Sequence, residues 1–499
     1  MSNLRILYPD IPAKAATIES SHPWNDLFPL SNLIDGERRT VAQRSATSSA
    51  DNFTWILLDR GGTDTANYLA LMNIGTRASR MWLQGASVSG LQPTKISGCI
   101  GWWESSTLVT KDGSNLVTVV GDRSGYGRDL VNDPLDSGTS KPTWVDAPSG
   151  INGLPKLSFS GAALGPRLVA DNAVAAASGS DKPFSAFIVF RPSSVTGTQT
   201  LLELNNQNSG GWARIYLDGT TIKHLRRDDA ASSVTNTSTG TVALNTTYVL
   251  AVSFAGTTVS AWLDGAQILN ASACNVGTLT MHRVVVGATS LASSSSDLFN
   301  GDIVEVIVYD SALGSTDRGN VESYLTAKWK TAPVVNTAVS TLVGPQGTDW
   351  VTTFSETSAY RYWWVGYQAS ATTTLRHSKL YLGTAWNPGV ECDYEWQRTP
   401  VKAPDWRAAS GAVHLARRER PRYRATITWS GLTDAECESF AADIGGKRHR
   451  SGFVLHAAAE GQILDSRTLL HCEVVEFYRL RTVKPDWNTL TVVCEEMQP

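Results

Sequence analysis

Five short apolar runs between residues 184 and 309 constrain the fold of this 499-residue chain more than any other feature. Turn residues separate the runs at short intervals, and two runs end in Asp-Gly, at Asp218-Gly219 and Asp264-Gly265. Asp-Gly tolerates the positive φ angles of tight hairpins. Short strands joined by tight turns predict an antiparallel sandwich or barrel. The runs are Phe184–Phe190, Trp212–Leu217, Tyr248–Phe254, Val259–Leu263 and Ile303–Tyr309.

A short helix is predicted to follow these strands. Val321, Tyr324, Leu325 and the pair Lys328–Trp329 fall at helical spacing, and Pro333 prevents the helix from continuing. The region resembles the concanavalin A-like (laminin G-like) jelly-roll family. The segments that carry the resemblance are GWWESSTLV, GDRSGYGRDL, INGLPKLSFSG and GDIVEVIVYDSAL, followed by VESYLTAKW. The resemblance implies a two-sheet antiparallel sandwich, often a carbohydrate- or cell-surface-binding module.

The sequences on either side of this region resemble two halves of a discoidin-like (galactose-binding-like) domain. Asn32–Gly36, Trp55–Asp59 and Leu69–Ile74 resemble its opening, and Tyr360–Gly366 and Leu375–Gly383 its closing strands. Neither half could bury its apolar face alone, so we expect the halves to pair across the insertion. The predicted fold is mainly β, with residues 1–97 and 332–395 as the split galactose-binding-like sandwich and 98–331 as the inserted jelly roll. Residues 396–499 form a small C-terminal β-domain with one helix.

The C-terminal domain contains a predicted helix with a capping box. Thr433 precedes Glu436 by three residues, Phe440 continues the apolar stripe, and Gly445-Gly446 ends the helix. Strands are expected at Phe453–His456, Leu469–Val475 and Thr489–Cys494. This order resembles the ring-forming β-domains of phage tail and baseplate proteins, and the N-terminal NLIDGERRT is similar to phage virion proteins with a discoidin-like domain. The resemblance implies a tail-tip protein similar to a distal tail protein, for which tail symmetry would favour six copies.

Charge and cysteine usage exclude several classes of protein. Lys and Arg total 43 against 46 Asp and Glu, a net charge of −3, whereas nucleic-acid binding needs a basic excess.

The six cysteines show no C-x-x-C pair, which favours buried free thiols over a zinc site or a disulfide framework. We find no signal-peptide pattern and no apolar run of membrane-spanning length, so we expect synthesis in a cytoplasm and no membrane insertion.

One acidic run is a candidate for catalysis. Glu391, Asp393 and Glu395 alternate, so on a strand they would share one face. The pattern resembles the catalytic strand of jelly-roll endo-glycanases, with one Glu as nucleophile, the other as acid/base, and the Asp tuning the pair. Retaining glycosidases place the two carboxyls about 5–5.5 Å apart, whereas the Cα atoms of Glu391 and Glu395 would be roughly 13 Å apart on a straight strand. The run also follows the jelly-roll region instead of lying within it, so an acidic face of a connecting strand is the favoured interpretation.

Tryptophans supply the candidates for sugar binding. The chain has 17, an excess that suits sugar-stacking platforms or interfaces. Within the jelly-roll region we take Trp144, Trp212 and Trp262 as exposed candidates, although core packing is the commoner fate of any one of them. Trp102 and Trp103 are adjacent, so we expect one ring inside the sandwich and one outside.

Other side chains suggest interfaces or metals. Arg417, Arg418, Arg420, Arg422 and Arg424 form a basic cluster, interpreted as a subunit interface more readily than as solvated surface or a nucleic-acid site. The sequence motifs support no metal site and no cofactor. Calcium held by scattered loop carboxylates, as in some laminin G-like modules, stays open, with Asp122 and Asp302 as guesses.

These features favour a non-enzymatic virion protein at a phage tail tip or baseplate. Its partners would be copies of itself in a ring, tail-tube and other baseplate proteins, and host-surface glycans. One alternative is a polysaccharide-degrading glycoside hydrolase using Glu391 and Glu395. Another is a free carbohydrate-binding protein.

Overall fold

The protein is mainly β, with two α-helices in the part of the chain described here. The computed structural model describes residues 5–8, 17–20, 42–44, 53–66, 68–74, 78–86, 92–133, 141–161, 165–207, 210–274, 277–291, 294–333, 335–338, 348–353, 359–369, 375–377, 379–386, 397–401, 422–443, 453–456, 469–481 and 487–496. Neither helix in these ranges has the length and apolarity that crossing a membrane requires.

An inserted sandwich of two antiparallel sheets occupies the middle of the chain. The first sheet has nine strands, in the order β19 (Ser233–Thr241), β18 (Thr221–Arg227), β17 (Trp212–Asp218), β16 (Thr198–Asn205), β24 (Arg283–Val286), β13 (Leu168–Ala170), β10 (Leu130–Asn132), β9 (Val117–Val120) and β8 (Val109–Lys111). The second has eight, in the order β11 (Thr143–Val145), β12 (Lys156–Ser160), β27 (Asn300–Tyr309), β15 (Phe184–Pro192), β20 (Tyr248–Ala255), β21 (Thr258–Leu263) and β22 (Ala266–Ala273), with β7 (Cys99–Glu104) also paired to β27. Short pairs join β14 (Gly179–Ser180) to β23 (Thr278–Leu279) and β25 (Thr289–Leu291) to β26 (Ser294–Ser296). Three 3-10 turns lie at Pro93–Lys95, Ala147–Ser149 and Ala175–Ala177.

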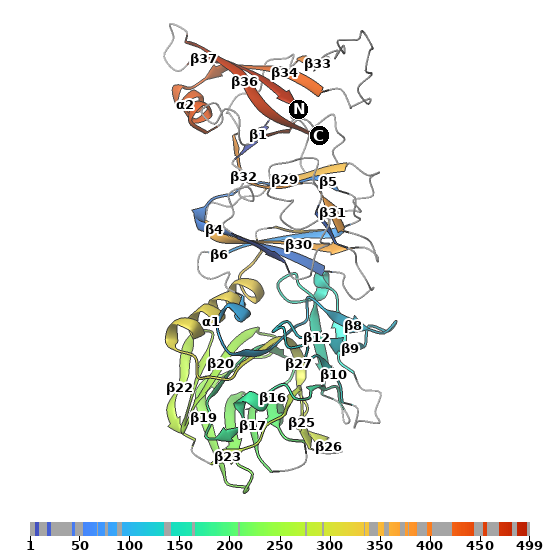
Figure 1. Ribbon diagram of the computed structural model, residues 1–499, viewed down its shortest axis with the longest axis vertical. Helices are drawn as coiled ribbons and strands as arrows, with labels where there is room; N and C mark the ends of the chain where they lie inside the picture. Colours follow the sequence, from blue (N-terminus) through green and yellow to red (C-terminus); the bar gives the residue numbers. More distant parts are fainter. Residues whose placement is uncertain are drawn as a thin grey trace, which may run out of the picture.

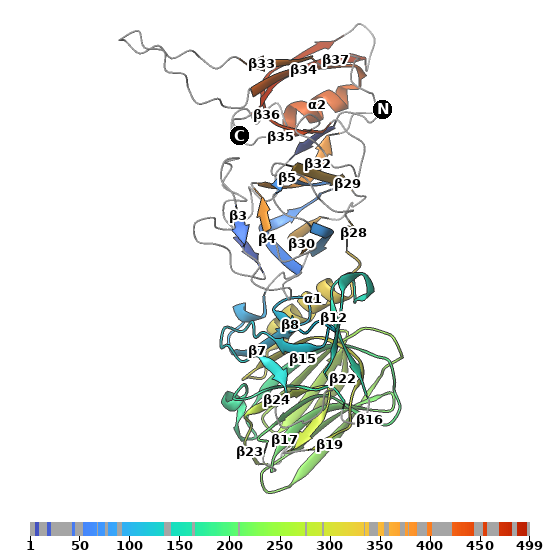
Figure 2. The same cartoon turned by 90° about the vertical axis from the view of Figure 1, so that its right-hand side faces the viewer.

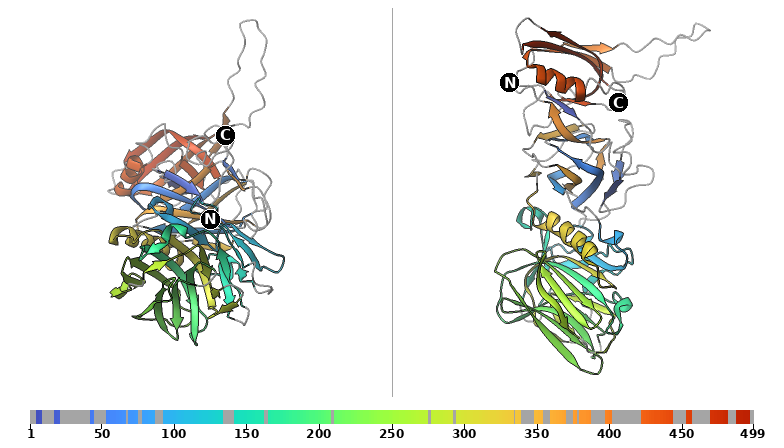
Figure 3. Two further views of the ribbon diagram at one scale, coloured as in Figure 1. Left: turned by 60° about the horizontal axis from the view of Figure 1, so that its bottom comes forward. Right: turned by 90° about the vertical axis from the view of Figure 1, so that its left-hand side faces the viewer.

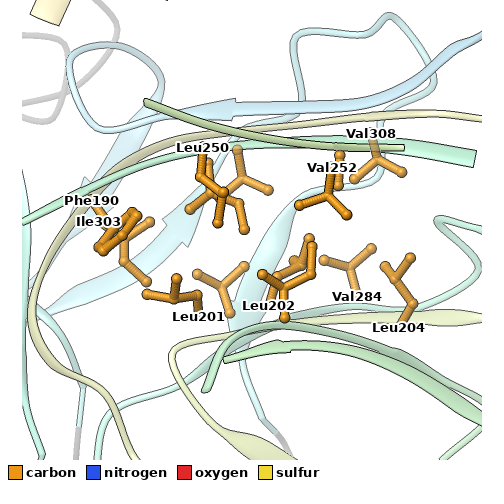
Figure 4. Packing of buried hydrophobic residues seen from close by; sticks show 14 of the residues in the cluster. Phe190, Leu201, Leu202, Leu204, Leu250, Val252, Val284, Ile303 and Val308 are labelled. Carbon is orange, nitrogen blue, oxygen red and sulfur yellow. The ribbon is translucent and has the colours of Figure 1, made fainter. Parts of the chain in front are cut away.

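The five strands predicted in this region are all present, as β15, β17, β20, β21 and β27. The predicted hairpin turn between β21 and β22 has φ values of 53° at Asp264 and 80° at Gly265. Positive φ at both central residues is the requirement of a type I′ turn. Apolar rows from the two sheets meet between them, as Figure 4 shows for Phe190, Leu250 and Val252 opposite Leu201 and Leu202.

The two sheets differ in how many of their faces are buried. Along β17, buried Ala213, Ile215 and Leu217 alternate with partly exposed residues, so this strand buries one face. Along β15, every residue from Phe184 to Phe190 is buried, because its sheet is covered on both sides. The apolar run FSAFIVF and the alternating run WARIYLD therefore follow directly from the position of each strand.

Helix α1 (Ser315–Trp329), which confirms the predicted helix, packs on the outer face of the eight-stranded sheet. A buried ion cluster fixes it there. Glu104 of β7 and Glu305 of β27 lie directly opposite each other, each 1% exposed. The Lys328 ammonium of α1 contacts Glu104 and lies 2.9 Å from Oε2 of Glu305. Glu305 also accepts hydrogen bonds from Trp329 Nε1 (2.6 Å), Trp102 Nε1 (2.7 Å) and the Tyr324 hydroxyl (2.9 Å).

Burial has the largest effect on the pKa of Glu305 in this cluster. It raises the pKa of Glu305 to about 7, and the donors from Trp329, Trp102 and Tyr324 oppose the rise. Burial also lowers the pKa of Lys328, and Arg123 donates to Glu104 over 2.5 Å, so two basic groups face two carboxyls. Paired in this way, the charges can remain in an interior that would exclude any one of them alone.

Strands from before and after the sandwich pair with one another. One sheet has the order β2 (Thr17–Ser20), β4 (Phe53–Asp64), β30 (Tyr360–Ala369), β6 (Ala78–Ala86) and β28 (Val335–Ala338). In a second group, β5 (Tyr68–Ile74) lies between β29 (Thr348–Thr353) and β32 (Lys379–Trp386), and β3 (Ala42–Arg44) pairs with β31 (Leu375–His377). We call these strands the split domain. Figures 1 and 2 show it stacked between the inserted sandwich and the C-terminal strands along the long axis.

The split domain and the sandwich share an apolar core, which we call the interdomain core. Trp55, Trp82 and Trp364 of the split domain, each at most 2% exposed, join Trp102 and Trp329 of the sandwich in it. The Tyr324 and Trp364 rings lie 6.3 Å apart, and Trp82 Nε1 donates to the carbonyl of Asn152 over 3.1 Å. Part of the tryptophan excess therefore serves an interface between two domains of one chain. Figure 3 shows α1 lying between the two domains.

A third unit contains β33 (Gln397–Val401), β34 (Arg422–Leu432), helix α2 (Asp434–Asp443), β35 (Phe453–His456), β36 (Leu469–Arg481) and β37 (Asn488–Glu496). The predicted capping box is present, since Thr433 N donates to Glu436 Oε2 (2.8 Å) and Glu436 N to Thr433 Oγ1 (3.2 Å). Strand β1 (Arg5–Tyr8) lies between β32 and β35, where Ile6 pairs with Trp386 and with Leu455. A single sheet thus runs through the split domain and the C-terminal unit, in the order β29-β5-β32-β1-β35-β36-β37-β34-β33.

Candidate carbohydrate-binding face

The interdomain core decides which face of the inserted sandwich is available to a ligand. Helix α1 and the split domain cover the outer face of the eight-stranded sheet. On the nine-stranded sheet, the partly exposed residues of β17 and β18 lie on the outer face. A ligand therefore has access to the outer face of the nine-stranded sheet at β17 and β18, whereas the central strands of the other sheet are covered.

Three side chains of β17 form a row on this face. Trp212, Arg214 and Tyr216 alternate with the buried Ala213, Ile215 and Leu217, so all three project outward. The guanidinium carbon of Arg214 lies 5.8 Å from the Trp212 ring centre and 6.0 Å from that of Tyr216. Arg227 of β18, opposite Trp212 in the register, lies 4.2 Å from the same indole. The result is a strip of aromatic rings interleaved with hydrogen-bond donors.

Ion pairs hold the arginine of this row in place. Arg214 Nε lies 2.9 Å from Glu203 Oε2, and Arg214 Nη1 lies 3.0 Å from Asp297 Oδ2. Asn205 donates to the other oxygen of Glu203 over 2.7 Å. Glu203 and Asn205 are both fully buried. The side chains beneath the row are therefore ordered before any ligand arrives.

A second set of ion pairs lies beside this face, at the neighbouring strands β10, β13 and β24, and is largely buried. Asp133 accepts from Arg167 Nε (2.9 Å) and from Arg283 Nη2 (2.8 Å), and Arg283 Nε lies 3.0 Å from Asp171. Arg167, Arg283 and Asp133 are buried. These pairs keep their charges inside the protein, and on the open face Arg214 is balanced by Glu203 and Asp297.

The three tryptophans proposed for sugar binding have different environments. Trp212 lies on the open face, and among the described residues its Nε1 is buried without a hydrogen-bond partner. The prediction that Trp144 is exposed is wrong, because its ring is only 5% exposed, packs in the sandwich core and donates to the carbonyl of Ser105. Trp262 is half-buried at the edge of the interdomain core, with the Arg318 guanidinium 3.7 Å from its ring centre. Sugar binding by Trp212 and Trp262 stays a prediction.

Trp102 and Trp103 point to opposite sides of the sheet, as expected of neighbours on a strand. Trp103 lies between the two sheets, and Trp102 lies in the interdomain core. Both are 1% exposed, so the ring outside the sandwich is covered by the split domain. Sequence reasoning missed the roles of Arg214, Tyr216 and Arg227, although the alternation in WARIYLD carries the signal for the first two.

The acidic run and most of the basic cluster fall outside the described residues. These are Glu391, Asp393, Glu395, Arg417, Arg418 and Arg420; Arg422 lies in β34 without a described side chain. Arg424 is exposed, and its Nη2 lies 3.1 Å from Glu495 Oε2 within the same chain. Cys99, Cys274, Cys437 and Cys494 are buried free thiols, as predicted, whereas Cys392 and the side chain of Cys472 lie outside the described part.

The two aspartates considered for calcium are engaged by protein donors. Asp122 accepts hydrogen bonds from Ser124 and from the backbone N–H groups of Trp102 and Arg128. Asp302 Oδ2 lies 3.1 Å from Lys156 Nζ and 2.7 Å from Arg191 Nη2. Within the described ranges, no three His, Cys, Asp or Glu residues gather in a way that could hold a metal ion. These contacts give calcium binding no support.

Sequence comparison agrees with this geometry. Residues 170–317 match the concanavalin A-like lectin/glucanases superfamily. The inserted domain is a concanavalin A-like jelly roll. The match covers strands β14 to β27, most of which belong to the two facing sheets, and ends at the start of α1. A comparison with curated proteins gave no match to the chain.

Solved structures that resemble this chain do so distantly. Domain 4 of AbnA, an extracellular arabinanase from Geobacillus stearothermophilus solved with arabinotriose, is 14% identical, with a TM-score of 0.33 over 46% of this chain and 98% of that one. A sialidase from Trypanosoma rangeli is 15% identical, with a TM-score of 0.32 over 46% of this chain and 33% of the sialidase. The CBM40 of the Ruminococcus gnavus IT-sialidase, bound to α2,3 sialyllactose, is 17% identical, with a TM-score of 0.27 over 30% and 86%.

Proposed function

We propose that the jelly roll binds glycans on the outer face of its nine-stranded sheet. The observation that carries the proposal is the row Trp212–Arg214–Tyr216 on the face that the split domain leaves open. Aromatic rings stack on the C–H faces of sugars, and guanidinium groups donate to ring and hydroxyl oxygens. Arg214 is held by Glu203 and Asp297, so its position does not have to be established on binding.

The test is glycan binding by the full chain with Trp212 replaced by Ala. We expect W212A to weaken retention in affinity electrophoresis on polysaccharide gels by at least about tenfold, because a stacking platform is removed. The matched control is Y126A, since Tyr126 is an aromatic of the same domain with 59% exposure. Equal loss in both variants, or no loss in W212A, would contradict the assignment of this face.

We further propose that the chain is a non-enzymatic structural protein of a phage tail tip or baseplate. In this proposal it is made in the host cytoplasm and assembles into a ring with copies of itself, beside tail-tube and other baseplate proteins. The jelly roll would attach to host-surface glycans, each contact weak and the array strong. The proposal rests on the resemblance of the C-terminal unit to ring-forming tail domains and on the layout in Figure 2, with the jelly roll at one end and the C-terminal unit at the other.

Two exposed apolar side chains of the C-terminal unit support an assembly surface there. Leu480 is 67% exposed and Trp487 51%, and they lie on either side of the connection between β36 and β37. Burying large apolar side chains that are exposed in the isolated chain favours association at an interface. The wild-type protein is therefore expected to form closed rings in negative-stain images, with a uniform mass by light scattering.

The assembly test uses the double variant L480S/W487S. It should shift the light-scattering mass toward the 53.8 kDa monomer without changing the fold. L244S is the control, because Leu244 is 50% exposed on the jelly roll, away from the proposed ring. A wild-type protein that stays monomeric at high concentration would instead favour a free carbohydrate-binding protein.

A further inference from the structure

A groove lies where α1 and the β21–β22 turn of the jelly roll meet β6 and β30 of the split domain. Its volume is about 440 Å³, within the range of small-molecule sites. Its walls include Gly85 and Ala86 of β6, Tyr360 of β30, Asp264 of the turn, and Glu322 and Ser323 of α1. The groove is on the opposite sheet of the jelly roll from Trp212, so it is a separate site.

Glycines create the space in this groove. A Cβ on Gly85 would lie 2.2 Å from the Tyr360 ring, so the ring rests directly on the glycine. Gly319 of α1 also lines the groove, and a Cβ there would have no atom within 4 Å. The first glycine lets the aromatic wall approach β6, and the second leaves the floor of the groove open.

Two buried polar atoms at this place have no partner among the described residues. Glu322 is 7% exposed and lines the groove, and its Oε1 accepts no hydrogen bond there. Arg318, one helical turn earlier, has an unpartnered Nη1, and its Nε lies 3.8 Å from Oε2 of Glu322. Burial raises the pKa of Glu322, which reflects the cost of keeping this carboxyl away from water. One oxygen of the Glu322 carboxylate is thus unmet at the groove, although its other oxygen faces Arg318, and an unmet buried acceptor is costly.

We propose that this groove binds a neutral, hydroxyl-rich ligand, one or two sugar units in size. A ligand hydroxyl can donate to the unmet oxygen of Glu322, which lines the groove, whereas a ligand carboxylate could only accept and would repel it. A positively charged ligand is not required, because Arg318 faces Glu322 and Lys330 lies 2.6 Å from Asp264. Tyr360 supplies an apolar wall for the C–H face of a sugar ring. This inference goes beyond the proposed function, since it adds a second site at the junction of two domains.

The experiment measures the binding of lactose, maltose and cellobiose to the full chain by saturation-transfer NMR, at millimolar sugar. The blocking variant is G319L, whose side chain would fill the groove, and the size control is G319A. Both replacements are better helix formers than glycine, so neither should impair folding. We expect the wild type and G319A to bind at least one of the three sugars and G319L to lose about tenfold or more in affinity.

Two further variants make the result decisive. E322Q keeps the shape of the site and should weaken binding several-fold, and W212A should leave it unchanged. Loss in W212A together with unchanged binding in G319L would place the sugar on the open sheet and overturn the groove. The absence of a signal from all three sugars would also overturn the groove proposal. It would leave the proposal for the open sheet unaffected, because that proposal is tested by retention in polysaccharide gels.

Discussion

Replacing Lys328 by Met is expected to lower the free energy of unfolding by about 3–5 kcal/mol. The ammonium lies between Glu104 and Glu305, which face each other across neighbouring strands and are both 1% exposed. Without it, two like charges remain in the interior with only Arg123 to balance them. Methionine fills a similar volume, so the loss would report the charge and not a cavity.

The measurement is chemical denaturation of the full chain, with K330M as the control. Lys330 is two residues further along and pairs with Asp264, but its side chain is 26% exposed, so removing its charge should cost no more than about 1 kcal/mol. Adding E305Q to K328M should recover part of the loss, because it removes one of the two unbalanced carboxylates. If K328M costs no more than K330M, the cluster does not hold α1 on the sheet.

Replacing Trp364 by Ala is expected to cost about 3–5 kcal/mol and to separate the unfolding of two domains. Trp364 is 2% exposed and belongs to the interdomain core, with its ring 6.3 Å from Tyr324. Because this core is shared, we expect the split domain and the jelly roll of the wild type to melt in one calorimetric transition. In W364A the split domain should melt first and the jelly roll, which keeps its own core, at a higher temperature.

Trp363 supplies the matched control. It is the preceding residue on β30, is fully buried, does not belong to the interdomain core, and packs against Tyr360. W363A should destabilise the protein by a similar amount while the interdomain core stays intact, so its unfolding should remain coupled. Two transitions in the wild-type protein, or one in W364A, would show that the shared core does not couple the domains.

Local patterns in the sequence predicted the elements of the jelly roll and the start of the C-terminal helix well. The strands between Phe184 and Tyr309, the Asp264-Gly265 turn, helix α1 and the Thr433–Glu436 capping box are all present. Each depends on residues close together in the chain, where period and turn chemistry are informative.

What the sequence did not reveal depends on distant contacts. Trp144 and Trp212 both lie in short strands, and only the packing of the sheets makes the first a core residue and the second part of an open face. The helical spacing placed Lys328 in the predicted helix but gave it no partner, because Glu104 is far away in the chain. The split domain covers the outer face of the eight-stranded sheet, and no pattern within the jelly roll predicts this contact.

The position of β1 has a consequence for the order in which the chain can fold during synthesis. Ile6 is made long before its strand partners, Trp386 and Leu455. At about 5–20 residues per second, a ribosome would leave this strand unpaired for roughly tens of seconds. The jelly roll, whose strand partners all lie between residues 99 and 309, can complete its sheets in that interval. The continuous sheet would then be completed only after the jelly roll.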